Sequence, residues 1–136
     1  AGALIGSIIV SQLQEKIKNG TLWILGILFD GLTMSILFWS ESVATGMLML
    51  FFHGVGIPFI VVSRTSIIQT HTDNKYHGRF FSFVHLGVVG TTAISSGLVG
   101  ITLAFITVDM LFLFIGIGGA FCGILALIFT TIKNLK

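Results

Sequence analysis

Four ionisable side chains lie inside long apolar stretches of this sequence: Asp30, His53, Arg64 and His85. A charged group at the centre of a membrane-crossing helix costs about 2.5–3.5 kcal/mol on insertion scales, so such residues point to proton, ion or substrate sites. Asp30 is therefore a candidate proton or cation site. It has a plainer interpretation as a structural partner for Arg64 or a backbone amide, and the long stem of Arg64 also lets its head snorkel toward water.

The spacing of these residues places polar side chains on common helix faces. His53 and Arg64 are eleven residues apart, which leaves them within about 20° of each other and about 16 Å apart along a helix axis. Such a face favours a cavity or a helix interface over lipid, although a histidine there can also be a neutral hydrogen-bonding partner. His85 shares a face with Thr92 and Ser96. The candidate substrate or coupling residues are Asp30, His53, Arg64, His85, Thr92 and Ser96.

The residue patterns of soluble enzymes and metal proteins are weak here. Cys122 is the only cysteine, so it can form neither an internal disulfide nor a multi-cysteine metal site. His71 and His77 flank Asp73, but a single pair of histidines is a poor zinc signature. No nucleophile has a base beside it. The sequence predicts no enzyme activity, no metal, no cofactor and no nucleic-acid partner.

The composition indicates whether water or lipid surrounds the helices that carry these residues. Of 136 residues, 54% are hydrophobic and 9% are charged, and the mean hydropathy is +1.06. Soluble domains carry about a quarter charged residues, and the few charges here cannot cover a globular core in water. The lipid bilayer is therefore the expected partner of most of the surface.

Apolar runs long enough to cross about 30 Å of hydrocarbon occur four times. They predict one all-α, polytopic transmembrane helix bundle over residues 1–136, since strands of a membrane barrel would alternate polar and apolar residues. A shorter apolar run opens the chain and is interpreted as the end of a span that upstream helices complete. The partial run covers 1–13, and the full spans cover 21–40, 47–69, 80–106 and 108–132.

Lysine and arginine fall on one side of the predicted spans. Basic residues near span ends are retained in the cytoplasm, so these connections are expected to be cytoplasmic. The seven bases are Lys16, Lys18, Arg64, Lys75, Arg79, Lys133 and Lys136. We expect a multi-pass protein of the cell membrane with a cytoplasmic C-terminus.

Small residues in the spans predict helix packing and one bend. Glycine stripes in membrane helices let backbones approach closely, and two such stripes occur, at Gly90, Ala93, Gly97 and Gly100 and at Gly116, Gly119 and Gly123. Gly54, Gly56 and Pro58 lie near the middle of one span. Pro58 is expected to kink that helix, either as a hinge or for packing alone.

The segment "SRTSIIQTHTDNKYHGRFFSF" resembles the connection between the tenth and eleventh helices of major facilitator superfamily transporters, especially drug and macrolide exporters. The matching positions are Arg64, Gln69, Gly78, Arg79 and Ser82. "GSIIVSQLQEKIKNG" is similar to the family's degenerate glycine and basic loop motif between the eighth and ninth helices. The resemblance implies that the chain corresponds to the end of the eighth helix through the twelfth.

The resemblance also implies a function. It suggests part of a proton-coupled exporter of small lipophilic molecules that works by alternating access together with N-terminal helices of the same transporter. The tenth helix would line the central cavity, and the ninth and twelfth would support it, giving Asp30 a structural role. A cytoplasmic gate would include Gln69, Lys75, Gly78 and Arg79. Two alternatives stay open: uptake of a polar substrate by the same fold, and a noncatalytic membrane module that packs through its glycine stripes.

Overall fold

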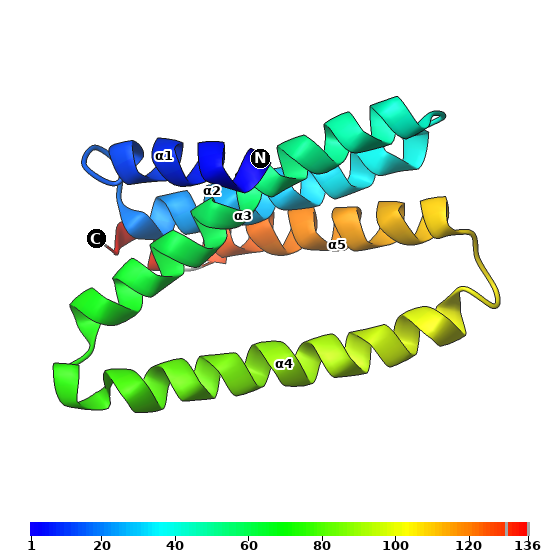
Figure 1. Cartoon of the computed structure of the whole chain (residues 1–136). Helices are drawn as coiled ribbons and strands as arrows, with labels where there is room; N and C mark the ends of the chain where they lie inside the picture. Colours follow the sequence, from blue (N-terminus) through cyan, green and yellow to red (C-terminus); the bar gives the residue numbers. More distant parts are fainter. Residues whose placement is uncertain (130, 136) are drawn as a thin grey trace.

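The computed structural model describes residues 1–129 and 131–135, and these residues form helices joined by short connections (Figure 1). No strand occurs in this part of the chain. Short 3-10 turns follow or precede several of the α-helices at Leu37–Trp39, Asn74–Tyr76 and Ile132–Asn134. The α-helices are α1 (Gly2–Leu13), α2 (Asn19–Ile36), α3 (Val43–His71), α4 (His77–Thr102) and α5 (Val108–Phe129).

Within the described part of the chain, four helical segments are long and apolar enough to cross a bilayer, and α1 is a shorter apolar helix. The four are Asn19–Trp39, Val43–His71, Asn74–Thr102 and Val108–Phe129. The predicted all-α, multi-pass membrane helix bundle is thereby confirmed.

The ends of α3 and α4 differ from the expected 47–69 and 80–106. The helix α3 begins at Val43 because Ser42 and Thr45 form a capping box, in which the Oγ of Ser42 accepts from the Thr45 N–H at 3.2 Å and the Oγ1 of Thr45 accepts from the Ser42 N–H at 3.2 Å. The helix α4 ends at Thr102, where the chain enters a turn in which the Ala104 N–H donates to the carbonyl oxygen of Ile101 at 3.1 Å and the Phe105 N–H donates to that of Thr102 at 2.9 Å.

The last helix is also shorter than the expected 108–132, and the segment over 131–135 rests on the start of α2. The Gly20 N–H donates to the carbonyl oxygen of Leu135 at 3.0 Å, and the Thr21 hydroxyl donates to that of Lys133 at 2.9 Å. Residues 130 and 136, and with them the predicted role of Lys136, lie outside the described residues.

The helix α2 is the centre of the packed part of the bundle, with α5 and α3 against it and α1 against α3 (Figure 1). A Cβ added to Gly116 would meet the carbonyl oxygen of Gly31 at 2.6 Å, and one added to Gly123 would meet the Leu28 side chain at 2.7 Å. The predicted packing role of the Gly116, Gly119 and Gly123 stripe is confirmed, with α2 as its partner.

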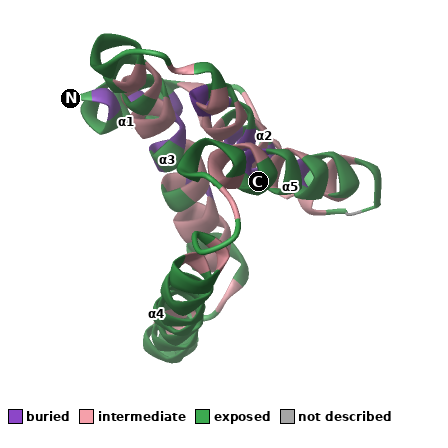
Figure 2. Ribbon diagram, turned by 90° about the vertical axis from the view of Figure 1, so that its right-hand side faces the viewer, coloured by how far each residue is buried: buried purple, intermediate pink, exposed green. Residues whose placement is uncertain are grey.

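The helix α4 lies apart from this packed group (Figures 1 and 2). It has no buried residue, and a Cβ added to Gly90, Gly97 or Gly100 would meet no atom of the described chain within 4 Å. The first glycine stripe therefore has no packing partner among the described residues.

The basic connections lie together at one end of the bundle. The α1–α2 connection carries Lys16 and Lys18, the α3–α4 connection and first turn of α4 carry Lys75 and Arg79, and Lys133 follows α5. These segments occupy the same side in Figure 1, with the N-terminal part of α2 bonded to the C-terminal turn. The lysine and arginine residues of these connections thus lie on one side of the folded chain, as predicted.

Candidate functional site

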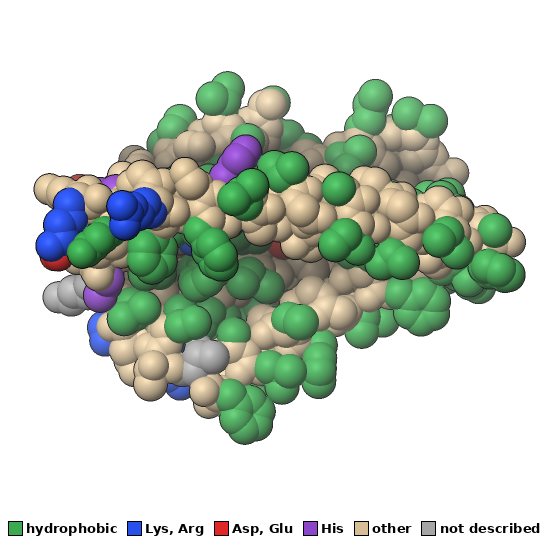
Figure 3. All heavy atoms as spheres, turned by 90° about the horizontal axis from the view of Figure 1, so that it is seen from below, with side chains coloured by type: hydrophobic (Ala, Val, Ile, Leu, Met, Phe, Trp, Pro, Cys, Tyr) green, Lys and Arg blue, Asp and Glu red, His purple; other side chains and the backbone are tan. Residues whose placement is uncertain are grey.

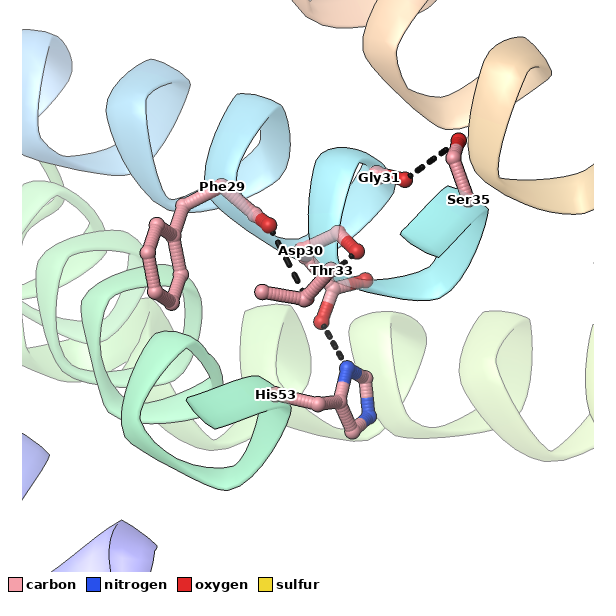
Figure 4. A network of polar contacts seen from close by, with 6 residues as sticks. All are labelled: Phe29, Asp30, Gly31, Thr33, Ser35 and His53. Atoms are coloured by element: carbon pink, nitrogen blue, oxygen red, sulfur yellow. Dashed lines mark hydrogen bonds and ion pairs between the residues drawn. The ribbon is translucent and has the colours of Figure 1, made fainter. Parts of the chain in front are cut away.

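Asp30 of α2 and His53 of α3 face each other across the interface of their helices (Figure 4). The Nδ1 atom of His53 lies 2.9 Å from Oδ1 of Asp30, and the side chains are 22% and 30% exposed. The two atoms are close enough for an ion pair when His53 is protonated, whereas the ring N–H lacks hydrogen-bond alignment and the Nδ1 atom is otherwise buried. Two ionisable groups are therefore held together close to the middle of apolar helices.

The hydroxyl groups next to this pair are already engaged. The Thr33 hydroxyl donates to the carbonyl oxygens of Phe29 and Asp30, both at 2.9 Å, and the Ser35 hydroxyl donates to that of Gly31 at 2.9 Å (Figure 4). Because these bonds stay within α2, they leave the Asp30 carboxylate to His53.

The predicted hinge lies beside the pair. A Cβ added to Gly56 would meet the Phe29 ring at 2.8 Å, and one added to Gly54 would meet the backbone nitrogen of Ala3 at 3.6 Å. Pro58 is buried, and α3 continues through it from Val43 to His71. Gly54 and Gly56 thus give α3 close contacts with α1 and α2 immediately after His53.

An apolar cavity of about 440 Å³ opens next to the same interface. Phe29 belongs to its lining and connects it in sequence to Asp30. The other lining residues come from α2 and α3 and are Leu25, Gly26, Leu28, Leu32, Val55 and Phe59. A cavity of this kind suits an apolar ligand or a lipid chain.

The suggested pairing of Asp30 with Arg64 is wrong, because the carboxylate is paired with His53. Arg64 lies toward the basic end of α3 and lines a crevice of about 480 Å³ between α3 and α4. The remaining lining residues all come from α4: Phe81, Ser82, Val84, His85 and Val88. The fold therefore joins Arg64 with His85 and separates Arg64 from His53, although His53 and Arg64 share a helix face in sequence.

Thr92 and Ser96 lie farther along α4 and are exposed. The Thr92 hydroxyl donates to the carbonyl oxygen of Val88 at 2.8 Å, and the Ser96 hydroxyl donates to that of Thr92 at 2.9 Å. The structure does not bring these two residues to Asp30 or to the lining of the Arg64 crevice.

The expected gate residues surround the α3–α4 connection, where basic side chains gather at one end of the molecule (Figure 3). Lys75 lies 3.6 Å from Asp73 and 4.9 Å from the centre of the Tyr76 ring. Gln69 and Arg79 are exposed, and Gly78 has open space around it. His77 holds the connection together, since its Nε2 lies 2.8 Å from the carbonyl oxygen of Thr72.

Two contacts between helices were not predicted from the sequence, namely the hydrogen bonds of Gln14 and the pairing of Asp30 with His53. The Gln14 amide donates to Asn19 at 2.7 Å and to the Ser66 hydroxyl at 3.0 Å, which ties the α1–α2 connection to α3. The depth of Asp30 and His53 was a usable signal for their pairing. Asp30 lies nine residues before Trp39 and His53 ten residues after Val43, so the two occupy similar depths in an antiparallel pair of helices.

No protein-family model matches this chain, and no curated protein or solved structure was found to match it. The class that the fold defines is a multi-pass membrane protein built from apolar helices. Any narrower assignment depends on the residues themselves.

Proposed function

We propose that this chain is part of a major facilitator-type secondary active transporter, a noncatalytic carrier that exports small lipophilic molecules in exchange for protons. The observation that carries the proposal is the Asp30–His53 contact, which joins two apolar helices through groups that can gain or lose a proton. Ionisable residues within transmembrane segments belong chiefly to substrate paths and proton relays.

The position of the pair suggests how a proton would be coupled to movement. A proton that binds to Asp30 removes the charge of the carboxylate and weakens its contact with Nδ1 of His53. This loss of charge would weaken the contact between α2 and α3 beside Gly54, Gly56 and Pro58, the glycine- and proline-containing part of α3. A proton would thereby bias two arrangements of α3, which is the requirement for alternating access.

The apolar cavity beside Phe29 supports a lipophilic cargo. Its lining offers no charged group to compensate a polar substrate, which favours export of lipophilic molecules over uptake of polar ones. The resemblance to the facilitator family assigns the cavity-lining role to the helix that corresponds to α3, and α3 supplies Val55 and Phe59 to this cavity. The other five lining residues come from α2, to which the resemblance assigns a supporting role.

The charge distribution supports a location in the cell membrane with the basic end in the cytoplasm. Lys16, Lys18, Lys75 and Arg79 occupy connections at that end, and Glu41 and Asp109 lie near the opposite connections. Basic residues are retained on the cytoplasmic side during insertion, so the C-terminus would be cytoplasmic.

The proposal is tested with the complete transporter, in which N-terminal helices accompany this chain, purified into proteoliposomes that contain a pH-sensitive dye and carry an imposed pH gradient. Addition of ethidium, a lipophilic cation, should drive proton movement through the wild-type transporter. Asp30→Asn should abolish this movement, and Asp109→Asn should leave it intact because Asp109 lies at the start of α5, away from the pair. Proton movement that is equal in Asp30→Asn and the wild type would refute proton coupling at this site.

A second candidate function is supported by α4. A noncatalytic membrane module would use the open stripe of Gly90, Gly97 and Gly100 to pack against another membrane protein or another copy of the chain. Crosslinking in membranes measures this: Gly97→Leu should abolish a crosslinked complex, and Gly118→Leu should not. If the chain serves only as such a module, ethidium should cause no proton movement in the proteoliposome assay.

A further inference from the structure

The crevice between α3 and α4 combines an unpaired cation with polar and apolar walls. Arg64 is half-buried in it, and Ser82 and His85 are exposed on the α4 side. Phe81, Val84 and Val88 provide the apolar part of the lining. We propose that this crevice binds a phosphate group that carries net negative charge, either the headgroup of an anionic phospholipid or a free phosphate ion.

The charge of Arg64 has no counterpart in the described chain. None of the acidic residues lines the crevice; Asp30 is paired with His53, and Asp73 lies next to Lys75. The described residues give the Arg64 guanidinium neither a hydrogen bond nor an ion pair. A guanidinium is always charged and offers a fork of N–H donors that fits two phosphate oxygens, so an anion is the missing partner.

The neighbouring side chains suit the same ligand. The Ser82 hydroxyl and a ring N–H of His85 are donors within the lining, and phosphate oxygens are strong acceptors. The lining contains no carboxylate, so it offers no partner for the ammonium group of a zwitterionic headgroup. The crevice is therefore selective for a ligand with net negative charge.

The depth of the crevice corresponds to the boundary between headgroups and hydrocarbon. Arg64 lies seven residues before the end of α3 at His71, about 10 Å along the axis, and His85 lies eight residues after the start of α4, about 12 Å. Basic pockets between transmembrane helices at this level bind lipid headgroups, and the apolar side chains of the crevice can pack against an acyl chain. This inference does not depend on transport.

Two probes distinguish the sources of the phosphate. Native mass spectrometry of the delipidated protein compares the retention of dioleoyl phosphatidylglycerol with that of dioleoyl phosphatidylcholine. Equilibrium dialysis measures binding of radiolabelled inorganic phosphate. Arg64→Gln should weaken binding of phosphatidylglycerol, of phosphate or of both about tenfold, because a charge-assisted hydrogen bond is removed. If the retention of phosphatidylglycerol depends on Arg64, the ligand is a lipid. If the binding of inorganic phosphate depends on Arg64, the ligand is a free ion.

The matched control is Lys16→Gln, which removes the same charge at the same end of the bundle, in the α1–α2 connection. It should leave both affinities unchanged. Equal loss in Lys16→Gln and Arg64→Gln would show diffuse surface attraction and overturn the site, as would binding that is independent of Arg64 in both assays. If Arg64→Gln does not give a helical, monodisperse protein, Ser82→Ala decides, because it removes one exposed hydroxyl and should weaken binding about threefold.

Discussion

The Nδ1 atom of His53 lies 2.9 Å from Oδ1 of Asp30, and this contact joins α3 to α2 in the middle of two apolar helices. The pair lies immediately before Gly54 and next to the point where Gly56 packs against Phe29. An electrostatic contact and the glycine- and proline-containing part of α3 are thus adjacent. Substitutions at this pair are therefore expected to change both the stability of the bundle and its transport activity.

The Asp30–His53 contact should be visible as a coupling energy. Polar pairs between membrane helices contribute about 0.6 kcal/mol on average and at most about 1.7 kcal/mol. Asp30→Asn, His53→Gln and the double variant form a double-mutant cycle, measured by unfolding in mixed detergent micelles. We expect a coupling energy in this range. Strict additivity of the two single changes would mean that the contact does not stabilise the fold.

The Gly116 contact should limit the size of its side chain. Gly116→Ala places a methyl group against the carbonyl oxygen of Gly31 and should destabilise the bundle by about 1–3 kcal/mol, the usual cost of overpacking. Gly118→Ala is the matched control, because the same methyl group meets open space two residues away. Unfolding in mixed micelles compares the two, and equal stabilities would contradict the close packing of α2 and α5.

Pro58→Ala should slow transport while expression remains normal. The substitution restores the backbone N–H that proline lacks and straightens the preferred path of α3. If bending at Pro58 limits turnover, a barrier higher by about 1.4 kcal/mol slows the ethidium-driven proton movement about tenfold. Unchanged turnover with the same amount of protein in the membrane would make the proline a packing residue.

The orientation in the membrane can be read by cysteine labelling. In a Cys122→Ser background, Lys75→Cys and Glu41→Cys each place one thiol at an exposed position in connections at opposite ends of the bundle. A membrane-impermeant maleimide added to intact cells should label the Glu41 variant, and the Lys75 variant should react only after the membrane is permeabilised. The reverse pattern would contradict the orientation proposed from charge.

The sequence by itself determined the class of fold and most of the helices. Hydropathy and span length are properties of contiguous residues, so α2, α3, α4 and α5 were predictable to within a few residues. Their ends shifted where local bonds intervened, as at Ser42 and Thr102. The packing role of the Gly116, Gly119 and Gly123 stripe was also predictable, because close helix packing in lipid demands small residues on one face.

Only the tertiary structure decided which residues meet. The partner of Asp30 is His53 and the crevice partner of Arg64 is the α4 face with His85, because helix rotation, tilt and depth select one neighbour from several of the right type. Those quantities depend on packing over the whole interface, including the glycine contacts of α1, α3 and α5. A one-dimensional pattern gives the angle between residues of one helix, whereas the contact between two helices requires their relative placement.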